Sequence, residues 1–195
     1  LVPIVLPMLA GFGLLLWRPK QRRAREIYVI GFISLNAAIA IVEMLTLRGQ
    51  TFTFCHFTDK LELTLRIDGM SMIFGFIASI LWIIASFYSL EYMKHEGKEN
   101  KFFGFWTISF GVVLGIAFSA NLITMYFFYE LLTMATLPLV MHAMDKKASS
   151  AGKKYVAYSI TGESFGFIVI MILYNLGDSL NFVYGGVLSA EAIAG

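Results

Sequence analysis

The chain has very little cysteine, and this shortage excludes several kinds of chemistry. Cys55 is its single cysteine, so the sequence allows no intrachain disulfide, no cysteine-held metal site and no iron–sulfur cluster. It also lacks a dinucleotide-binding glycine motif and a pair of haem ligands. We therefore expect no redox chemistry on this chain, no cofactor and no bound metal ion.

Charge is also scarce, because charged residues make up only 14% of the chain and hydrophobic residues 58%, whereas roughly a quarter of a soluble protein is charged. A helix needs roughly 20 apolar residues to cross the roughly 30 Å hydrocarbon layer of a membrane. The sequence predicts an all-α, polytopic transmembrane helix bundle, a single domain over residues 1–195. Its spans are expected at about 1–17, 27–47, 69–90, 102–120, 121–143 and 155–176.

The basic residues gather in every second connection between the predicted spans. These are Arg18, Lys20, Arg22, Arg23 and Arg25, then Lys94, Lys98 and Lys101, then Lys146, Lys147, Lys153 and Lys154. The first cluster taken alone could indicate nucleic acid or anionic lipid, but its place between two spans favours an orientation signal. We expect the basic loops to face the cytoplasm, the N-terminus to lie outside and the chain to be a multi-pass protein of the inner (plasma) membrane, with no nucleic-acid partner.

The outer connection at residues 51–67 alternates apolar and polar residues on both sides of Thr58-Asp59-Lys60. This period of two predicts a small extracytoplasmic β-hairpin, for which we favour packing on the helices over a catalytic role. Small residues four apart, Gly111 with Gly115 and Gly162 with Gly166, predict close helix contacts.

Two acids lie deep within predicted spans and are the main candidates for chemistry. Glu130 lies nine residues from Asn121 and Glu163 nine residues from Lys154, which places each roughly 13.5 Å from an end of its helix. A charged residue at such depth is unfavourable by roughly 2.5–3.5 kcal/mol, and such residues commonly mark proton paths. We predict a proton relay through both acids. The alternative is a structural role, for Glu163 with hydrogen bonds from Ser159, Thr161 and Ser164.

Two weaker candidates lie near the cytoplasmic ends of these spans. Lys154 could serve proton entry, or it could be an anchor whose ammonium group reaches the membrane surface. His142 could hand protons inward, because the unperturbed pKa of histidine is near 6.5, or it could be a hydrogen-bonded histidine at the membrane interface.

An ordered series of motifs runs through residues 60–180. It comprises Asp68-Gly69-Met70-Ser71-Met72, Tyr92-Met93 with Glu96, Lys101-Phe102-Phe103, Asn121-Leu122, Phe127-Phe128-Tyr129-Glu130-Leu131-Leu132, and Lys154-Tyr155 with Tyr158 and Gly162. This series resembles the antiporter-like proton-channel subunits of respiratory complex I, membrane-bound hydrogenases and Mrp-type cation/proton antiporters.

The resemblance implies that Glu130 is a central proton-handling residue and that Lys154 matches a common family lysine. It also implies a lysine partner for Glu130 in a seventh span. Because the chain opens without methionine and ends after six predicted spans, we expect it to be the N-terminal part of a longer subunit.

Three functions follow as hypotheses. The first is a proton-translocating membrane subunit of a complex I-like assembly of the NADH:quinone oxidoreductase type, with a membrane-bound hydrogenase or an Mrp-type antiporter as the alternative within the family. The second is a complete small secondary transporter, and the third is a structural or assembly subunit. The expected partners are other membrane subunits, the lipid bilayer and protons, with sodium as the alternative ion.

Overall fold

The apolar runs of the sequence form α-helices in the computed structural model, which describes residues 1–19, 21–58, 60–143, 146–177 and 179–183. In chain order the helices are α1 (Val2–Trp17), α2 (Arg22–Thr46), α3 (Gly69–Tyr92), α4 (Glu99–Ala117), α5 (Leu122–Val140) and α6 (Lys146–Leu176). The predicted helical architecture is therefore confirmed, with one small sheet beside it.

Five of these helices, α2 to α6, are long and apolar enough to cross a membrane. α1 is also apolar, but its 16 residues extend only about 24 Å, less than the roughly 30 Å hydrocarbon layer. The largest difference from a predicted boundary is in α6, which begins at Lys146 rather than near residue 155. Hydropathy identifies only the apolar part of a helix, whereas lysine and alanine favour helix and extend α6 through its polar first turns.

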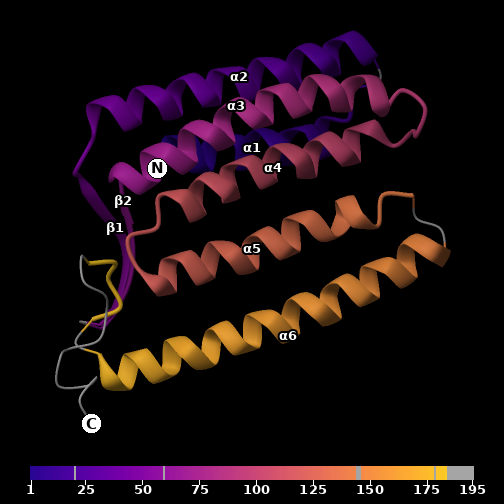
Figure 1. Cartoon of the computed structure of the whole chain (residues 1–195). Helices are drawn as coiled ribbons and strands as arrows, with labels where there is room; N and C mark the ends of the chain where they lie inside the picture. Colours follow the sequence, from indigo (N-terminus) through magenta and orange to yellow (C-terminus); the bar gives the residue numbers. More distant parts are fainter. Residues whose placement is uncertain (20, 59, 144–145, 178, 184–195) are drawn as a thin grey trace.

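α4 is the central helix of the bundle and contacts α1, α2, α3 and α5 (Figure 1). Its Phe103, Phe110 and Leu114 are fully buried. α6 lies at the edge of the bundle and packs against α5. The hydrophobic core therefore lies around α4, and the α5–α6 contact lies to one side of it.

Two glycines let other helices approach α4 closely. A Cβ on Gly111 would lie 2.3 Å from the carbonyl oxygen of Ile4 on α1, and a Cβ on Gly115 would lie 2.4 Å from the ring of Phe128 on α5. Both distances are far below van der Waals contact. The predicted helix contact at this pair is confirmed, and the two glycines face different neighbours.

The same prediction was wrong for the glycine pair on α6. A Cβ on Gly162 would meet nothing within 4 Å, and one on Gly166 would reach only the Tyr126 ring, at 4.0 Å. The physical reason is the edge position of α6, whose main neighbour among the described residues is α5.

The predicted hairpin is confirmed by two antiparallel strands, β1 (Thr51–Thr58) and β2 (Leu61–Arg66). β2 also bonds to the short segment between α4 and α5. The backbone N–H of Arg66 donates to the carbonyl of Phe118 at 2.7 Å, and the N–H of Ala120 donates to the carbonyl of Thr64 at 2.9 Å. The hairpin is thus packed on the helix ends, as expected.

Two polar residues cap the helices that follow them. The side chain of Asp68 accepts a hydrogen bond from the N–H of Ser71 at the start of α3. Asn121 caps α5 by accepting from the N–H of Thr124, and its amide nitrogen donates to the carbonyl of Glu62 in β2. These bonds satisfy backbone groups that a helix start leaves unpaired.

The Asp68 cap gives a testable stability prediction. Partial burial opposes ionisation, but hydrogen bonds from Ser71 and the contact with Arg66 hold the pKa of Asp68 below its ordinary value of 3.8. The stabilisation from its charged form is therefore present above that ordinary value and is lost as the pH falls through the lowered pKa. We expect Asp68→Ala to reduce the free energy of unfolding at neutral pH by about 1 kcal/mol, measured by denaturation in detergent. Asp68→Asn keeps an oxygen that can accept from the N–H of Ser71, so its free energy of unfolding should fall less. Equal losses of stability in the two variants would contradict the capping role of Asp68.

The three basic connections lie together at one end of the bundle, opposite the hairpin (Figure 1). At this end Arg25 of α2 forms an ion pair with Glu99 of α4. The His142 ring, just after α5, hydrogen-bonds the carbonyl of Gly97 before α4 at 2.9 Å. These contacts bring the α1–α2, α3–α4 and α5–α6 connections together, as the alternation of charge predicts.

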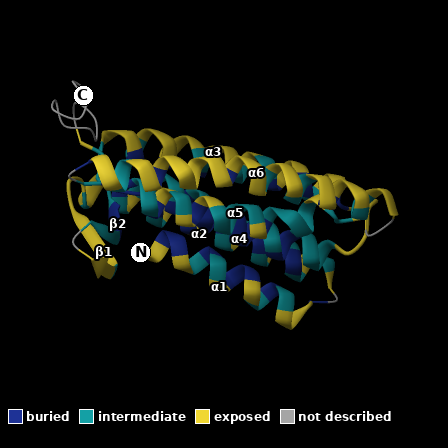
Figure 2. Cartoon of the chain, turned by 90° about the horizontal axis from the view of Figure 1, so that it is seen from below, coloured by how far each residue is buried: buried dark blue, intermediate teal, exposed yellow. Residues whose placement is uncertain are grey.

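The outward faces of α3 and α6 are largely exposed (Figure 2). The side chains on them are mainly apolar, including Phe74 and Ile77 on α3 and Phe165 and Ile168 on α6. Apolar surface of this extent is typical of contact with lipid or with another apolar partner.

Candidate functional site

Glu163 is a buried acid on an otherwise exposed helix. It is 4% exposed, whereas the adjacent Gly162 and Ser164 are exposed. Its carboxylate accepts a hydrogen bond from the hydroxyl of Thr133 on α5, at 2.5 Å between the two oxygens. The α5–α6 contact therefore encloses Glu163 and supplies a donor to it from the neighbouring helix.

Glu130 lies beside Glu163 and completes an acid pair. It is half-buried on α5, and its carboxyl is close enough to that of Glu163 for the two charges to interact. Tyr126, four residues before Glu130 on the same helix, is near enough to interact with its carboxyl. Two ionised carboxylates at close range repel each other, and a proton on one of them relieves the repulsion. The pair can thus hold one proton and one negative charge.

Three hydroxyl groups of α6 were expected to donate hydrogen bonds to Glu163, and two of them bond elsewhere. Thr161 donates to the carbonyl of Ala157, and Ser164 donates to the carbonyl of Ile160. Within a helix these bonds to the preceding turn are always within reach of threonine and serine. The donor to Glu163 comes instead from Thr133 on α5, which the sequence pattern around Glu163 did not predict.

The sequence does contain a pattern that indicates which residues of α5 lie near Glu163. Tyr126, Glu130 and Thr133 are four and three residues apart, so they lie on one face of α5. That face is directed at α6. Polar residues at this spacing around a buried acid indicate the side of the helix on which its partners lie.

A second polar contact joins α5 and α6 closer to the basic end. The hydroxyl oxygens of Thr136 and Tyr155 are 2.7 Å apart, and Thr136 also bonds the carbonyls of Leu132 and Thr133. The α5–α6 contact therefore carries polar groups from Tyr126 past the acid pair to Tyr155.

The structure does not bring the two weaker candidates to the acid pair. Lys154 is exposed and lies nine residues before Glu163 on α6, about 13.5 Å along the helix. His142 lies beyond the end of α5, where its ring contacts the Gly97 carbonyl and the edge of Phe102. Their roles in proton transfer stay predictions.

The acid pair also has no cation beside it within the part of the chain that the structure describes, since none of the ion pairs found there includes Glu130 or Glu163. Nor does any cluster of three or more His, Cys, Asp and Glu side chains suited to a metal ion occur there. Within those residues, the partners of the pair are neutral hydroxyl groups.

Two family models match separate parts of the sequence. Residues 57–103 match the model described as NADH-ubiquinone oxidoreductase (complex I), chain 5 N-terminus, which covers β2 and α3. Residues 119–188 match the model described as NADH:quinone oxidoreductase/Mrp antiporter, transmembrane. The second match includes both acids of the pair.

Curated relatives extend the likeness over nearly the whole chain. The chloroplastic NAD(P)H-quinone oxidoreductase subunit 5 of Phaseolus vulgaris is 28% identical over 93% of this chain, and that of Arabidopsis thaliana is 26% identical over 93%. The matched region is 26% of the length of each relative, so the chain spans about a quarter of these proteins.

A solved structure supports the same fold. A chain of the membrane-bound sulfane sulfur reductase (MBS), described as an archaeal respiratory membrane complex, matches with a TM-score of 0.74 at 15% sequence identity. The match covers 92% of this chain and 38% of that one. This likeness concerns the fold alone. The two family models and the curated relatives identify the chain as a member of the antiporter-like membrane subunits of the complex I and Mrp antiporter family.

Proposed function

We propose that this chain is part of a proton-translocating subunit in a redox-driven assembly of the NADH:quinone oxidoreductase type. In this proposal Glu130 and Glu163 hold a proton and pass it on. The observation that carries the proposal is the burial of Glu163 against Glu130 and Thr133, between two helices long enough to cross a membrane. An acid in that setting is unfavourable for insertion and is usually retained for function.

The chemistry of the pair suits reversible proton binding. Two ionised carboxylates this close repel each other, so the pair takes up one proton to relieve the repulsion. With that proton in place the pair shares one negative charge, and a second proton or an approaching cation displaces the first. Thr133 orients the Glu163 carboxylate toward Glu130 by its hydrogen bond.

Proton access follows the polar groups of the α5–α6 contact. On the basic side, Tyr155 and Thr136 provide hydroxyl groups one turn from Thr133. On the other side, the Tyr126 hydroxyl is near Glu130. Hydroxyl groups both donate and accept, so they can relay a proton between water and the acids.

The relatives indicate the kind of assembly to which we propose that this chain belongs. Their printed name, NAD(P)H-quinone oxidoreductase subunit 5, favours a quinone-linked assembly whose electron transfer takes place on other subunits. We propose such membrane subunits as the partners of this chain. We also place its basic loops on the cytoplasmic face of a plasma membrane, whereas the plant relatives are chloroplastic. A membrane-bound hydrogenase or an Mrp-type antiporter is the alternative assembly, and sodium the alternative ion.

The test uses closed inside-out membrane vesicles from cells that express the chain with its native partners. On addition of NADH and quinone, we expect acidification of the vesicle lumen, reported by a pH-sensitive dye. The signal should fall when the gene for this chain is deleted and return with a plasmid copy, in sodium-free medium as well. Acidification that is unchanged by the deletion would contradict the proposal, and a strict sodium requirement would favour the antiporter alternative.

A further inference from the structure

The face of α6 that packs on α5 carries three polar side chains, each four residues from the next. They are Tyr155, Ser159 and Glu163, and this spacing places them on one side of the helix. Tyr155 and Glu163 both contact hydroxyl groups of α5. Ser159 is half-buried between the exposed Tyr158 and Ile160. It therefore lies in the same helix contact, midway between the other two along α6.

Ser159 is the third hydroxyl group that was expected to donate to Glu163. Thr161 and Ser164 donate to the preceding turn of their own helix, as hydroxyls in helices commonly do. The Ser159 hydroxyl makes no hydrogen bond with any residue that the structure describes. A hydroxyl without a partner inside a membrane-spanning helix is unfavourable. Its proton and its lone pairs are thus available to a neighbouring group.

A gap of about one group separates Glu163 from the polar contact nearer the basic end. Glu163 accepts from Thr133 at 2.5 Å. The Tyr155 hydroxyl lies 2.7 Å from that of Thr136. Thr133 and Thr136 are three residues apart, about 4.5 Å along α5, whereas a hydrogen bond between two oxygens spans roughly 2.5–3.0 Å. At least one further group must therefore bridge the Tyr155 hydroxyl and the Glu163 carboxylate.

The Thr136 hydroxyl is not this bridge, because its proton points elsewhere. A hydroxyl has one proton to donate, and Thr136 donates to the carbonyl of Leu132 at 2.7 Å. The bond between Thr136 and Tyr155 is therefore donated by Tyr155. A backbone carbonyl has no proton to pass on, so this branch ends on α5. Ser159, on the facing side of α6, has its hydroxyl free for the bridge.

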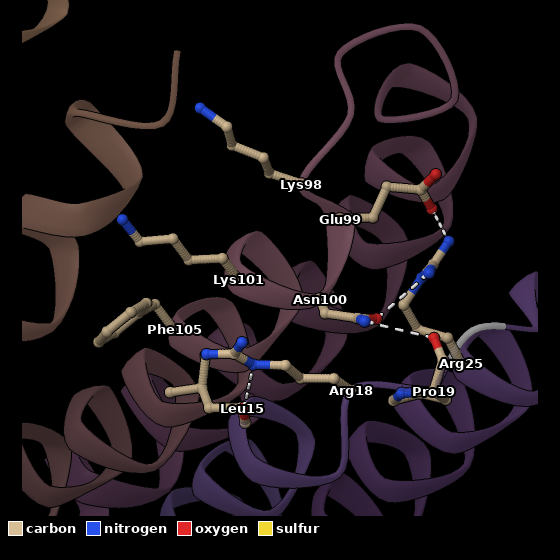
Figure 3. A pocket seen from close by; sticks show the side chains of 9 residues that line it. All are labelled: Leu15, Arg18, Pro19, Arg25, Lys98, Glu99, Asn100, Lys101 and Phe105. Atoms are coloured by element: carbon tan, nitrogen blue, oxygen red, sulfur yellow. Dashed lines mark hydrogen bonds and ion pairs between the residues drawn. The ribbon is translucent and has the colours of Figure 1, made fainter. Parts of the chain in front are cut away.

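A pocket at the same end of the bundle belongs to other helices. Its volume is about 760 Å³, and it lies where the end of α1 meets the start of α4 (Figure 3). Arg25 and Glu99, two of its lining residues, form an ion pair. None of the described residues that line it comes from α5 or α6. We therefore start the route at Tyr155, in the α5–α6 contact itself.

We propose that Ser159 passes protons between Tyr155 and Glu163, a role that depends on the proton-handling function of the acid pair. The O–H bond of Ser159 breaks as its proton joins the Glu163 carboxylate. At the same time the Ser159 oxygen takes the proton of the Tyr155 hydroxyl, which water at the basic end replaces. Each hydroxyl oxygen gains one proton for the one it gives, so no alkoxide forms. The Tyr155 O–H must first turn away from Thr136, so the bond between these two hydroxyls holds the route closed.

The test compares single-hydroxyl variants in closed inside-out vesicles that contain the native assembly. The measurement is vesicle acidification for each NADH oxidised. We expect Ser159→Ala to lower this ratio by about tenfold, and Ser159→Thr, which keeps a hydroxyl, to retain most of it. Ser164→Ala is the matched control, because it makes the same change next to Glu163 in a hydroxyl that bonds its own helix. Native electrophoresis checks the assembly of each variant.

Tyr155→Phe tests the same route without changing Ser159, including the case in which Ser159→Ala fails to assemble. It keeps the ring and removes the hydroxyl that contacts Thr136, and we expect a similar loss of acidification. Two groups that act in series on one route are not additive. The double variant, Tyr155→Phe with Ser159→Ala, should therefore lose no more than the more affected single variant.

Four results would overturn the proposal. Unchanged acidification in Ser159→Ala or Tyr155→Phe, with a loss in Glu163→Gln, would remove the hydroxyl from the route and leave the acid pair in place. Equal losses in Ser159→Ala and Ser159→Thr, or in Ser159→Ala and Ser164→Ala, would indicate packing. Losses that multiply in the double variant would mean that Tyr155 and Ser159 act independently. Normal acidification in Glu163→Gln would end the proton-handling function itself, and this role with it.

Discussion

Glu163→Gln is expected to reduce redox-driven proton movement by about tenfold or more while the assembly still forms. Glutamine has nearly the same shape as glutamate and its carbonyl can still accept from Thr133, but it cannot bind or release a proton at neutral pH. The same result is expected for Glu130→Gln. The measurement is vesicle acidification relative to NADH oxidation, with assembly checked by native electrophoresis.

The outcome separates a relay from a structural acid. If the acids only join α5 to α6, glutamine preserves most of the hydrogen bonds and proton movement should persist. Retained acidification in Glu163→Gln would therefore refute the proton-handling role.

A matched pair of hydroxyl variants tests the geometry around Glu163. Thr133→Val removes the donor to Glu163 with little change of shape and should slow proton movement and alter its pH profile. Ser164→Ala is the control, because Ser164 is adjacent to Glu163 but donates to its own helix. Equal effects of the two changes would mean that Thr133 has no special part in positioning the acid.

The second large effect is expected from Gly111→Ala, which should destabilise the bundle by about 2 kcal/mol or more. The added Cβ would lie 2.3 Å from the backbone carbonyl oxygen of Ile4, so α1 and α4 must move apart. Overpacking of a tight core typically costs about 1–3 kcal/mol, and here the obstacle is backbone, which cannot rotate away. Thermal denaturation in detergent, followed by circular dichroism, measures the loss.

Gly31→Ala is the control for helix propensity. A Cβ at Gly31, within α2, would meet nothing within 4 Å, so this change should be neutral or stabilising by up to about 1 kcal/mol. An equal effect of both substitutions on the melting temperature would contradict the close contact at Gly111.

Much of this architecture was predictable because its causes are local or lie in long stretches of sequence. An apolar run of about 20 residues forms its backbone hydrogen bonds within itself, which favours a helix. The basic residues that alternate between connections predicted which loops share an end of the bundle. The alternation around Thr58 predicted the hairpin, because side chains of a strand point to opposite faces.

The partners of the buried acid were harder to predict because they depend on how two helices are rotated against each other. Glu163 was found from its depth, but its bonds were expected from Thr161 and Ser164 on the same helix. Both hydroxyls bond to their own backbone, and Thr133 from α5 takes the place beside the carboxylate. Similarly, the glycine spacing on α6 is the same as on α4, but α4 contacts four other helices, whereas α6 packs mainly on α5 among the described residues.

The hairpin and the basic loops hold the two ends of the bundle by different forces, and this makes the molecule respond unevenly to ionic strength. Backbone bonds between neutral groups, such as those of Arg66 with Phe118 and Ala120 with Thr64, are scarcely weakened by salt. The exposed ion pairs at the opposite end, Lys94 with Glu91 and Arg22 with Glu26, are weakened as the salt concentration rises. Each of these pairs joins residues three or four apart in one segment, so a rise in salt is expected to loosen the local structure at the cation-rich end first, while the bonds of the hairpin persist.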